Sequence, residues 1–233
     1  MARFSGERPP FFFMEDGVWV GFDVDLGQDI AARMGVRYEE TVQAVSFDEV
    51  VVEIAQGAAD IGVSKLSATL DRALQVRFSS PYLTVYQAVV VNRVAVRRAA
   101  DPFGELNDRR YTVGALAGSA YVGYARASLS NAQVRPHDDF AEMMADVVSG
   151  DLHAVLMDSA RANTWRRANA EHLIQVRTVV DNTRRDPLAV AISWENPNLL
   201  AWVDLYLATI RADGTADRLY QKWFGDPATT QRR

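Results

Sequence analysis

A ten-residue pattern that occurs twice, 93 residues apart, constrains the fold of this chain more than any other feature. Residues 54–63 read Ile-Ala-Gln-Gly-Ala-Ala-Asp-Ile-Gly-Val, and residues 147–156 read Val-Val-Ser-Gly-Asp-Leu-His-Ala-Val-Leu. Each copy combines the end of a helix, a glycine and a short apolar run typical of a strand buried in a parallel sheet. Unless the similarity is fortuitous, it predicts an α/β protein of two lobes, each a mostly parallel sheet flanked by helices, with a cleft between the lobes.

The places where the chain crosses between the lobes follow from two β-rich runs. The first ends near Val91, before a polar stretch that contains arginines, and the second begins at Leu188, after another polar segment. We take these runs as the two crossings. Lobe 1 is therefore expected to comprise residues 1–91 and 187–233, and lobe 2 residues 92–186.

Amphipathic helices and short β-rich runs alternate along the chain. The expected strands lie at 18–20, 36–41 and 60–64, and the expected helices at 25–34, 47–55, 197–210 and 215–223. Gly35 follows the first of these helices, where a glycine commonly ends a helix. Asp23 and Asp25 stand at the junction between a strand and the same helix, so we expect them to cap it.

The ends of the repeated strands point to a binding site. Open parallel sheets bind ligands beyond the carboxyl ends of their strands. The two copies of the pattern place Lys65 in one lobe and Asp158 in the other at equivalent ends. We expect these two residues to face each other across the cleft.

The composition excludes several classes of function. Of the 233 residues, 48% are hydrophobic and 24% are charged, without low-complexity runs, which is typical of a folded globular protein and not of a disordered one. The net charge of −5 is not segregated into an acidic or basic half, which argues against nucleic acid or an anionic membrane as the main partner. The expected partner is a small molecule.

The residues that usually hold metals or carry out catalysis are absent or scattered. There is no cysteine, and the histidines His137, His153 and His172 lie far apart, each without a ligand-like neighbour one helical turn away. The sequence contains no P-loop, dinucleotide fingerprint, zinc-protease motif or nucleophile elbow. We therefore expect no metal, no cofactor and no catalytic residue.

The chain shows no targeting signal. No apolar stretch approaches the roughly 18 to 20 residues of a membrane span. The opening residues Met1 to Phe4 lack the apolar core of a signal peptide. The expectation is either a cytoplasmic protein or a secreted one whose leader has been removed.

Five segments, taken in order, resemble family 3 extracellular solute-binding proteins, the receptors for polar amino acids of ABC importers. They are Pro9–Phe11, Gly21–Leu26, Gly57–Ile61, Ser67–Arg72 with Phe78–Tyr82, and Ala212–Thr215 with Leu219–Gly225. The resemblance covers nearly the whole chain and implies a type II periplasmic-binding-protein fold with lobe 1 formed by both chain ends. It also implies a non-enzymatic monomer, periplasmic or lipid-anchored outside the cell, which closes on an amino acid and delivers it to a membrane ABC permease.

In lobe 1 the resemblance implies a clamp for the ligand's carboxylate. Arg72 stands three residues after Thr69, as in the family, and a planar guanidinium can hold both carboxylate oxygens at once. Ser67 matches a family hydroxyl that reaches the same carboxylate. Phe47 matches an aromatic that lies on the ligand's side chain, with a core phenylalanine at a helix start as the alternative.

In lobe 2 the resemblance implies groups for both ends of the ligand. Asp158 matches the aspartate that accepts the ligand's ammonium, a cation that would keep a buried carboxylate ionised. Gly118 and Ser119 open a helix whose first N–H groups would face the carboxylate. The alternative for Ser119 is that it only caps this helix.

Two departures from the family pattern add positive charge to the predicted site. Arg8 replaces an aromatic residue of many relatives, and Lys65 replaces a common glycine in a chain with only one other lysine. With Arg72, these cations outnumber Asp158, which favours a ligand with a second acidic group, such as glutamate or aspartate. The alternative is that Arg8 and Lys65 extend into solvent.

Two other functions fit the same resemblance. Periplasmic cyclohexadienyl dehydratases share the scaffold, and Lys65 with Arg8 could hold the two carboxylates of a prephenate-like substrate. Asp158 favours a ligand with an ammonium group, which argues against prephenate but not against arogenate. The third possibility is the ligand-sensing domain of a receptor kinase or a channel.

Overall fold

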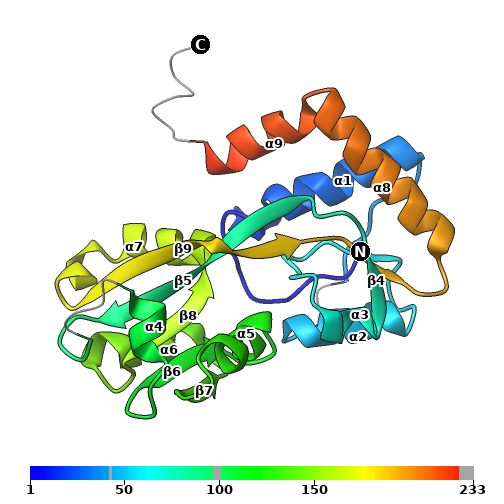
Figure 1. The fold of residues 1–233 in the computed structure, drawn as a ribbon. Coiled ribbons are helices and arrows are strands. Elements are labelled where there is room, and N and C mark those ends of the chain that lie inside the picture. The colour runs from blue at the N-terminus through cyan, green and yellow to red at the C-terminus, as the bar shows by residue number, and fades with distance from the viewer. Residues whose placement is uncertain (42–43, 97–100, 226–233) are drawn as a thin grey trace. The chain divides into compact units, whose positions relative to one another are not determined.

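The computed structural model describes residues 1–41, 44–96 and 101–225. The chain packs as two compact units (Figure 1). Unit 1 comprises Met1–Leu83 and Pro187–Arg233, and unit 2 comprises Thr84–Asp186. Both chain ends therefore belong to unit 1, while a single internal stretch forms unit 2.

The described residues of unit 1 form ten elements in chain order. They are β1 (Phe13–Glu15), β2 (Val18–Val20), α1 (Phe22–Met34), α2 (Phe47–Ala55), β3 (Ile61–Gly62), α3 (Leu70–Ala73), β4 (Val76–Phe78), β10 (Ala191–Ser193), α8 (Pro197–Ala212) and α9 (Thr215–Phe224). Its main sheet has the order β3-β10-β4, with Ala191 opposite both Gly62 and Phe78 in antiparallel pairs. Strand β10, which follows the return of the chain from unit 2, thus pairs the C-terminal part of unit 1 with its N-terminal part.

The two faces of this short sheet are covered by helices from both parts of the chain. On one face, α1 and α8 pack against alternate apolar residues of the sheet. The buried residues of this cluster are Phe22, Leu26, Ile30, Ile61, Val63, Val190, Ile192, Val203, Tyr206, Leu207 and Ile210. On the other face, Gly62 lies against Ile54 of α2, where an added Cβ would come within 3.3 Å of that side chain.

Most of the elements expected in unit 1 are present, with two differences. The helices expected at 47–55, 197–210 and 215–223 are confirmed, and Gly35 ends α1 in the left-handed conformation with φ 70°. The strand expected at 36–41 is reduced to a single bridge between Thr41 and Ala2. Val36 is 56% exposed, so its side chain does not pack into the core.

Capping of α1 by Asp23 and Asp25 is the second difference, and that prediction was wrong. The cap residue is Gly21, and no side chain bonds to the helix start. Asp23 is fully buried and accepts a hydrogen bond from the backbone of Lys65, whereas Asp25 binds residues of α9. Both carboxylates have tertiary partners that were not visible in the local sequence.

Unit 2 contains a five-stranded sheet. Its elements are β5 (Leu83–Asn92), α4 (Pro102–Leu106), β6 (Thr112–Leu116), α5 (Ala120–Ser128), β7 (Gln133–His137), α6 (Phe140–Ser149), β8 (Ala154–Asp158), α7 (Ser159–Ala168), a 3₁₀ helix (Ala170–Ile174) and β9 (Val176–Leu188). The strand order is β7-β6-β8-β5-β9, in which β6 is parallel to β7 and β8. β5 is antiparallel to β8, with Gln87 opposite Asp158.

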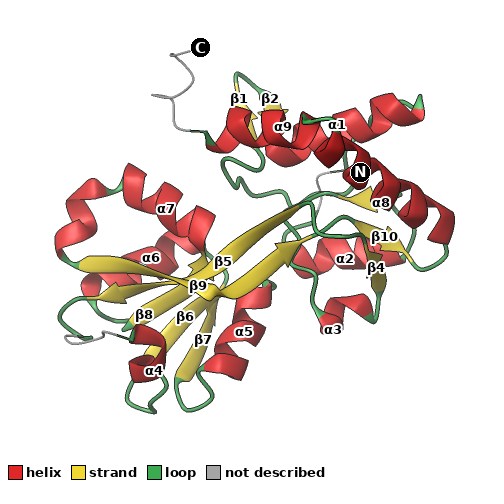
Figure 2. Ribbon diagram, turned by 45° about the horizontal axis from the view of Figure 1, so that its top comes forward, coloured by secondary structure: helices red, strands yellow, loops and turns green. Residues whose placement is uncertain are grey.

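Helices lie on both sides of the five-stranded sheet (Figure 2). Alternate residues of its central strands pack against these two layers. Val89 and Val91 of β5 pack with α4 and α5, together with Leu156 of β8. Ala88 and Val90 pack with α6 and α7 instead. Because both faces are covered, the strands are apolar along nearly their whole length, as a buried sheet requires.

The repeated ten-residue pattern has the same structure in both units. In unit 1 it is the end of α2, Gly57 with φ 74°, and β3. In unit 2 it is the end of α6, Gly150 with φ 100°, and β8. Both glycines hold a left-handed backbone that most other residues avoid. The predicted sequence of helix, glycine and strand is confirmed twice.

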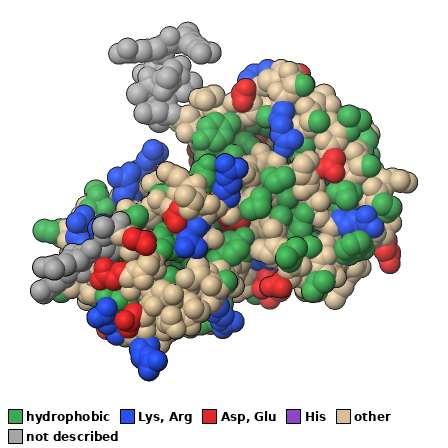
Figure 3. All heavy atoms as spheres, in the orientation of Figure 1, with side chains coloured by type: hydrophobic (Ala, Val, Ile, Leu, Met, Phe, Trp, Pro, Cys, Tyr) green, Lys and Arg blue, Asp and Glu red, His purple; other side chains and the backbone are tan. Residues whose placement is uncertain are grey.

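Two further features of the structure are the distribution of charged side chains on the surface and the length and polarity of the helices. On the face drawn in Figure 3, acidic and basic side chains are interspersed. Among the described residues, no helix is both long enough and apolar enough to cross a membrane.

Candidate functional site

A short turn in unit 1 fixes the side chain of Arg72. Thr69 caps α3, and its hydroxyl accepts a hydrogen bond from the Arg72 backbone N–H at 3.3 Å. The guanidinium turns back over the same loop, where Nη1 donates to the carbonyl oxygen of Ser67 at 3.3 Å. The structure therefore brings together the three residues that the sequence assigned to a carboxylate clamp.

Asp48 holds one edge of the Arg72 guanidinium. Nε and Nη2 both donate to its Oδ1, at 3.1 and 2.9 Å. The arginine side chain is 7% exposed, whereas that of Asp48 is 62% exposed and remains largely hydrated. Asp48 was missed in the sequence, although its position directly after Phe47 at the start of a helix was known.

Lys65 occupies a backbone conformation that favours glycine. Its φ is 51°, in the left-handed region, which costs a side chain about 1 to 2 kcal/mol. The backbone N–H donates to Oδ2 of the buried Asp23 at 2.6 Å, which fixes this conformation. The lysine side chain is buried, with Nζ 5.3 Å from the ring centroid of Phe11. A glycine would adopt this conformation without strain, whereas Lys65 keeps its side chain despite it.

The Asp23 carboxyl has an unusual environment. Burial raises its pKa from 3.8 to about 7, because the charged form loses its hydration. Hydrogen bonds from Tyr82 and from the Lys65 backbone, and the charges of Lys65 and Arg3, oppose that rise. Near neutral pH this carboxyl is therefore only partly ionised.

Arg8 lies on two aromatic rings and does not extend into solvent. Its guanidinium carbon is 4.3 Å from the ring centroid of Phe4 and 5.6 Å from that of Phe47. The two rings are themselves stacked, with centroids 4.9 Å apart. Arg8 is 7% exposed and Lys65 is 9% exposed, so the alternative that both point outward is not what the structure shows.

Arg8, Lys65 and Arg72, which we call the basic group, are linked through the start of α2 and the N-terminal segment. Phe47 contacts Arg8, and the next residue, Asp48, binds Arg72. The backbone of Phe4 donates to Ser64, the neighbour of Lys65, at 3.0 Å. All three of these cations are buried within unit 1.

The predicted residues of unit 2 lie at the start of two helices. Asp158 is the last residue of β8 and caps α7, where Oδ1 accepts from the Arg161 N–H at 2.8 Å. Gly118 has a φ of 64°, and Ser119 caps α5 by accepting from the Tyr121 N–H at 3.3 Å. Ser119 therefore caps α5, and Asp158 caps α7.

Strand alternation places these residues on one face of the sheet. Asp158 stands two residues after Leu156 on β8, so its side chain lies on the same face of the sheet, the face that packs against α5. Burial and the negative charges of Asp186 and Asp158 raise the pKa of Tyr121, in the first turn of α5. The carboxylate of Asp158 therefore lies near enough to the first turn of α5 for its charge to act on Tyr121.

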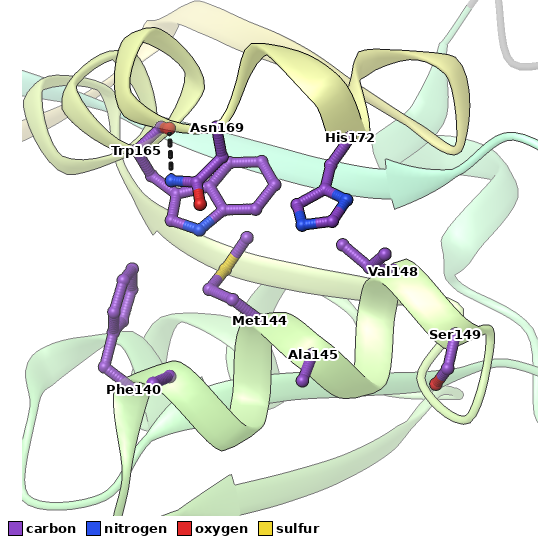
Figure 4. A pocket seen from close by; sticks show the side chains of 9 residues that line it. Phe140, Met144, Ala145, Val148, Ser149, Trp165, Asn169 and His172 are labelled. Carbon is purple, nitrogen blue, oxygen red and sulfur yellow. Dashed lines mark hydrogen bonds between the residues drawn. The ribbon is translucent and has the colours of Figure 1, made fainter.

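A separate pocket of about 470 Å³ lies in unit 2 between α6 and α7 (Figure 4). Trp165 and His172 stack along one side, with ring centroids 6.2 Å apart. It is lined by Phe140, Ala141, Met144, Ala145, Val148, Ser149, Trp165, Asn169 and His172. None of the predicted site residues is among them. Within the part of the chain that the structure describes, no cluster of His, Asp and Glu side chains could hold a metal ion.

The two α/β units together have the fold of type II periplasmic binding proteins, the class to which the similar solved structures belong. The chain belongs to the bacterial extracellular solute-binding proteins, family 3, whose family model matches residues 2–226. The resemblance that the sequence motifs indicated is thereby confirmed.

Relatives in this family have different ligands and activities. The L-cystine-binding protein TcyJ of Escherichia coli strain K12 is 27% identical over 233 residues, which cover 98% of this chain and 84% of that protein. An ancestral arginine-binding protein bound to arginine is 29% identical, with a TM-score of 0.83 over 96% of this chain and 97% of the other. The cyclohexadienyl dehydratase of Pseudomonas aeruginosa is 26% identical over 168 residues, which cover 72% of this chain and 62% of that enzyme.

Proposed function

We propose that the chain binds one amino acid through residues of both units and supplies it to an ABC permease, without catalysing a reaction. Arg72, with Ser67 and Thr69, takes the ligand's carboxylate, and Asp158 takes its ammonium. The start of α5 at Gly118 and Ser119 adds N–H donors to the carboxylate. The observation that carries this proposal is the buried guanidinium of Arg72, positioned by the turn at 67–72 in a family 3 chain.

The ligand that we favour is acidic, such as glutamate or aspartate. Arg8, Lys65 and Arg72 are all buried in unit 1, where Asp48 binds the Arg72 guanidinium and the partly ionised Asp23 accepts from the Lys65 backbone. A buried cation is stabilised by an anion within the site, and a second ligand carboxylate supplies one. Phe47 lies under Arg8 and therefore holds this cation, in addition to any contact with the ligand's side chain.

Replacement of Lys65 by methionine tests the acidic ligand. The variant keeps an unbranched side chain in the same backbone conformation and loses only the charge. We expect the affinity for L-glutamate to fall about tenfold and that for L-glutamine to change less than about twofold. Isothermal titration calorimetry measures both. Equal losses of affinity for the two ligands would show that Lys65 does not bind the second carboxylate.

The dehydratase relative supports one alternative, an enzyme that acts on a prephenate-like substrate. In that case Arg8 and Lys65 would hold two carboxylates of the substrate, and a general acid would be needed at its leaving group. Incubation of the purified chain with prephenate and with arogenate decides between these functions. Release of phenylpyruvate or phenylalanine at a rate that depends on Arg72 would establish the enzyme.

A thermal-shift screen against the twenty amino acids, L-cystine, citrate, prephenate and arogenate tests the binding proposal. A ligand at 100 times its dissociation constant stabilises the folded state by about 2.7 kcal/mol, which is a shift of several degrees. We expect the largest shift with L-glutamate or L-aspartate. If no amino acid raises the melting temperature, the proposed function is contradicted. If an amino acid other than glutamate or aspartate gives the largest shift, only the preference for an acidic ligand is contradicted.

The same proposal places the protein in the periplasm or, lipid-anchored, outside the cell, as a monomer with a membrane permease as its partner. A ligand-sensing domain of a receptor would use the same binding residues. The two functions differ in the partner that responds to the ligand-bound form, since a ligand shifts a conformational equilibrium only by its differential affinity for the two states.

A further inference from the structure

Gln87 is a buried polar residue to which the family motifs assign no role. It lies on β5 directly opposite Asp158 of β8, in an antiparallel pair. Side chains of residues paired in this way point to the same face of the sheet, with their Cβ atoms about 4.5 to 5.5 Å apart. Gln87 therefore stands beside the carboxylate that we assign to the ligand's ammonium.

The amide oxygen of Gln87 has an unmet hydrogen-bonding capacity. The residue is 8% exposed, and within the described part of the chain no donor lies within hydrogen-bonding distance of Oε1. A buried amide oxygen that has lost water without gaining a donor is unfavourable, and such groups are rare in folded proteins. A donor supplied by a ligand would remove this cost.

The neighbouring acidic groups indicate which kind of donor fits. Asp158 is a buried carboxylate opposite Gln87, and its Oδ1 accepts from the Arg161 N–H at the start of α7. Asp186 lies on the same side but accepts from the hydroxyls of Tyr121 and Tyr124, at 2.7 and 3.2 Å. A cation with several N–H groups suits a carboxylate and an amide oxygen side by side.

We propose that Gln87 is a specificity-determining ligand residue, whose Oε1 accepts a hydrogen bond from the α-ammonium group of the amino acid that Asp158 also binds. This inference rests on the proposed function and deepens it. An ammonium has three N–H donors, so a carboxylate and an amide oxygen together satisfy two of them. Gln87 thereby selects against ligands that have the carboxylate but lack the ammonium.

The test compares Gln87→Met with the wild type, using L-glutamate and its des-amino analogue glutarate as probes in isothermal titration calorimetry. Methionine has nearly the same length and no oxygen acceptor. We expect the affinity for L-glutamate to fall about tenfold and that for glutarate to change less than about twofold. The melting temperature without ligand stays the same or rises, because the variant removes an unsatisfied buried oxygen. A purely structural glutamine would instead lower it.

Two control variants sharpen the result. Gln87→Glu keeps an acceptor at the same place and should retain more L-glutamate affinity than Gln87→Met. Gln175→Met changes an exposed glutamine of the same unit and should leave both affinities unaltered. Equal losses for L-glutamate and glutarate, or no loss for either, would overturn the role of Gln87 while leaving the proposed function intact.

If the wild type binds L-arginine in place of L-glutamate, the same comparison uses L-arginine and its des-amino analogue 5-guanidinopentanoate. The α-ammonium is common to all amino acids, so the expected pattern is unchanged. Failure of the wild type to bind any amino acid would remove the proposed function and this inference together, which separates that outcome from a specific failure of Gln87.

Discussion

Replacing Arg72 by alanine lowers the affinity for the amino-acid ligand at least about 100-fold, because it removes the group that receives the carboxylate. The arginine is also the partner of Asp48, but that carboxylate is 62% exposed and remains hydrated in the variant. The fold should therefore survive the substitution. Isothermal titration calorimetry with L-glutamate measures the loss, and thermal melting without ligand checks the fold.

The matched variants distinguish charge from geometry. Arg72→Lys retains a cation but not the planar fork, so it should recover only part of the lost affinity. Arg37→Ala removes an arginine of the same unit whose side chain is 84% exposed and should change nothing. If Arg72→Ala binds the ligand as tightly as the wild type, Arg72 does not clamp the carboxylate.

The second large effect is the dependence of stability on pH through Asp23. Its pKa rises from 3.8 in the unfolded chain to about 7 in the folded protein. The folded state therefore keeps a proton that the unfolded state releases, and this stabilisation is complete below pH 4 and is lost as the pH rises through 7. The rise corresponds to about 4 kcal/mol.

Asp23→Asn isolates this contribution. Asparagine does not titrate, and its amide oxygen can still accept from the Lys65 N–H. We expect the difference in unfolding free energy, variant minus wild type, to rise by several kcal/mol between pH 4 and pH 8. Urea denaturation across this range measures it. Asp16→Asn, at an exposed left-handed position that asparagine tolerates, is the control. A difference that does not depend on pH would contradict the raised pKa.

The architecture could be predicted from the sequence because its signals are local. A helix end, a glycine and a strand occur within ten residues of one another, and the pattern appears twice. Apolar spacing likewise located α2, α8 and α9. The extent of β5 was harder to predict, because Gln87–Val91 pair with β8 in unit 2 and only this distant partner assigns them to that unit.

The site was predicted less completely, because its polar contacts join residues that are distant in the sequence. Asp48 binds Arg72 from 24 residues away, and Asp23 binds the backbone of Lys65 from 42 residues away. Without its partner, Asp23 looks like an ordinary helix cap, and that interpretation was wrong. Gln87 gave no signal in the sequence, since an amide within a β-rich run is not unusual.

Lys65 shows what a sequence can and cannot indicate. The resemblance to the family implied a glycine at this position, so the lysine drew attention to it. The side chain of Lys65 is buried and does not extend into solvent. Its left-handed backbone, with φ 51°, depends on the loop after β3 and on Asp23, neither of which is a local property. The sequence therefore identified an unusual residue without the reason for the strain.

Calorimetric titration of the wild-type chain with L-glutamate, beside Arg72→Ala and Asp158→Ala, tests most directly whether this protein captures an amino acid with these two residues. We predict one binding site per chain in the wild type and a loss of at least about 100-fold in each variant. Binding of an amino acid that is equally tight in the wild type and in both variants would contradict this function. Turnover of prephenate by the wild type would contradict it as well.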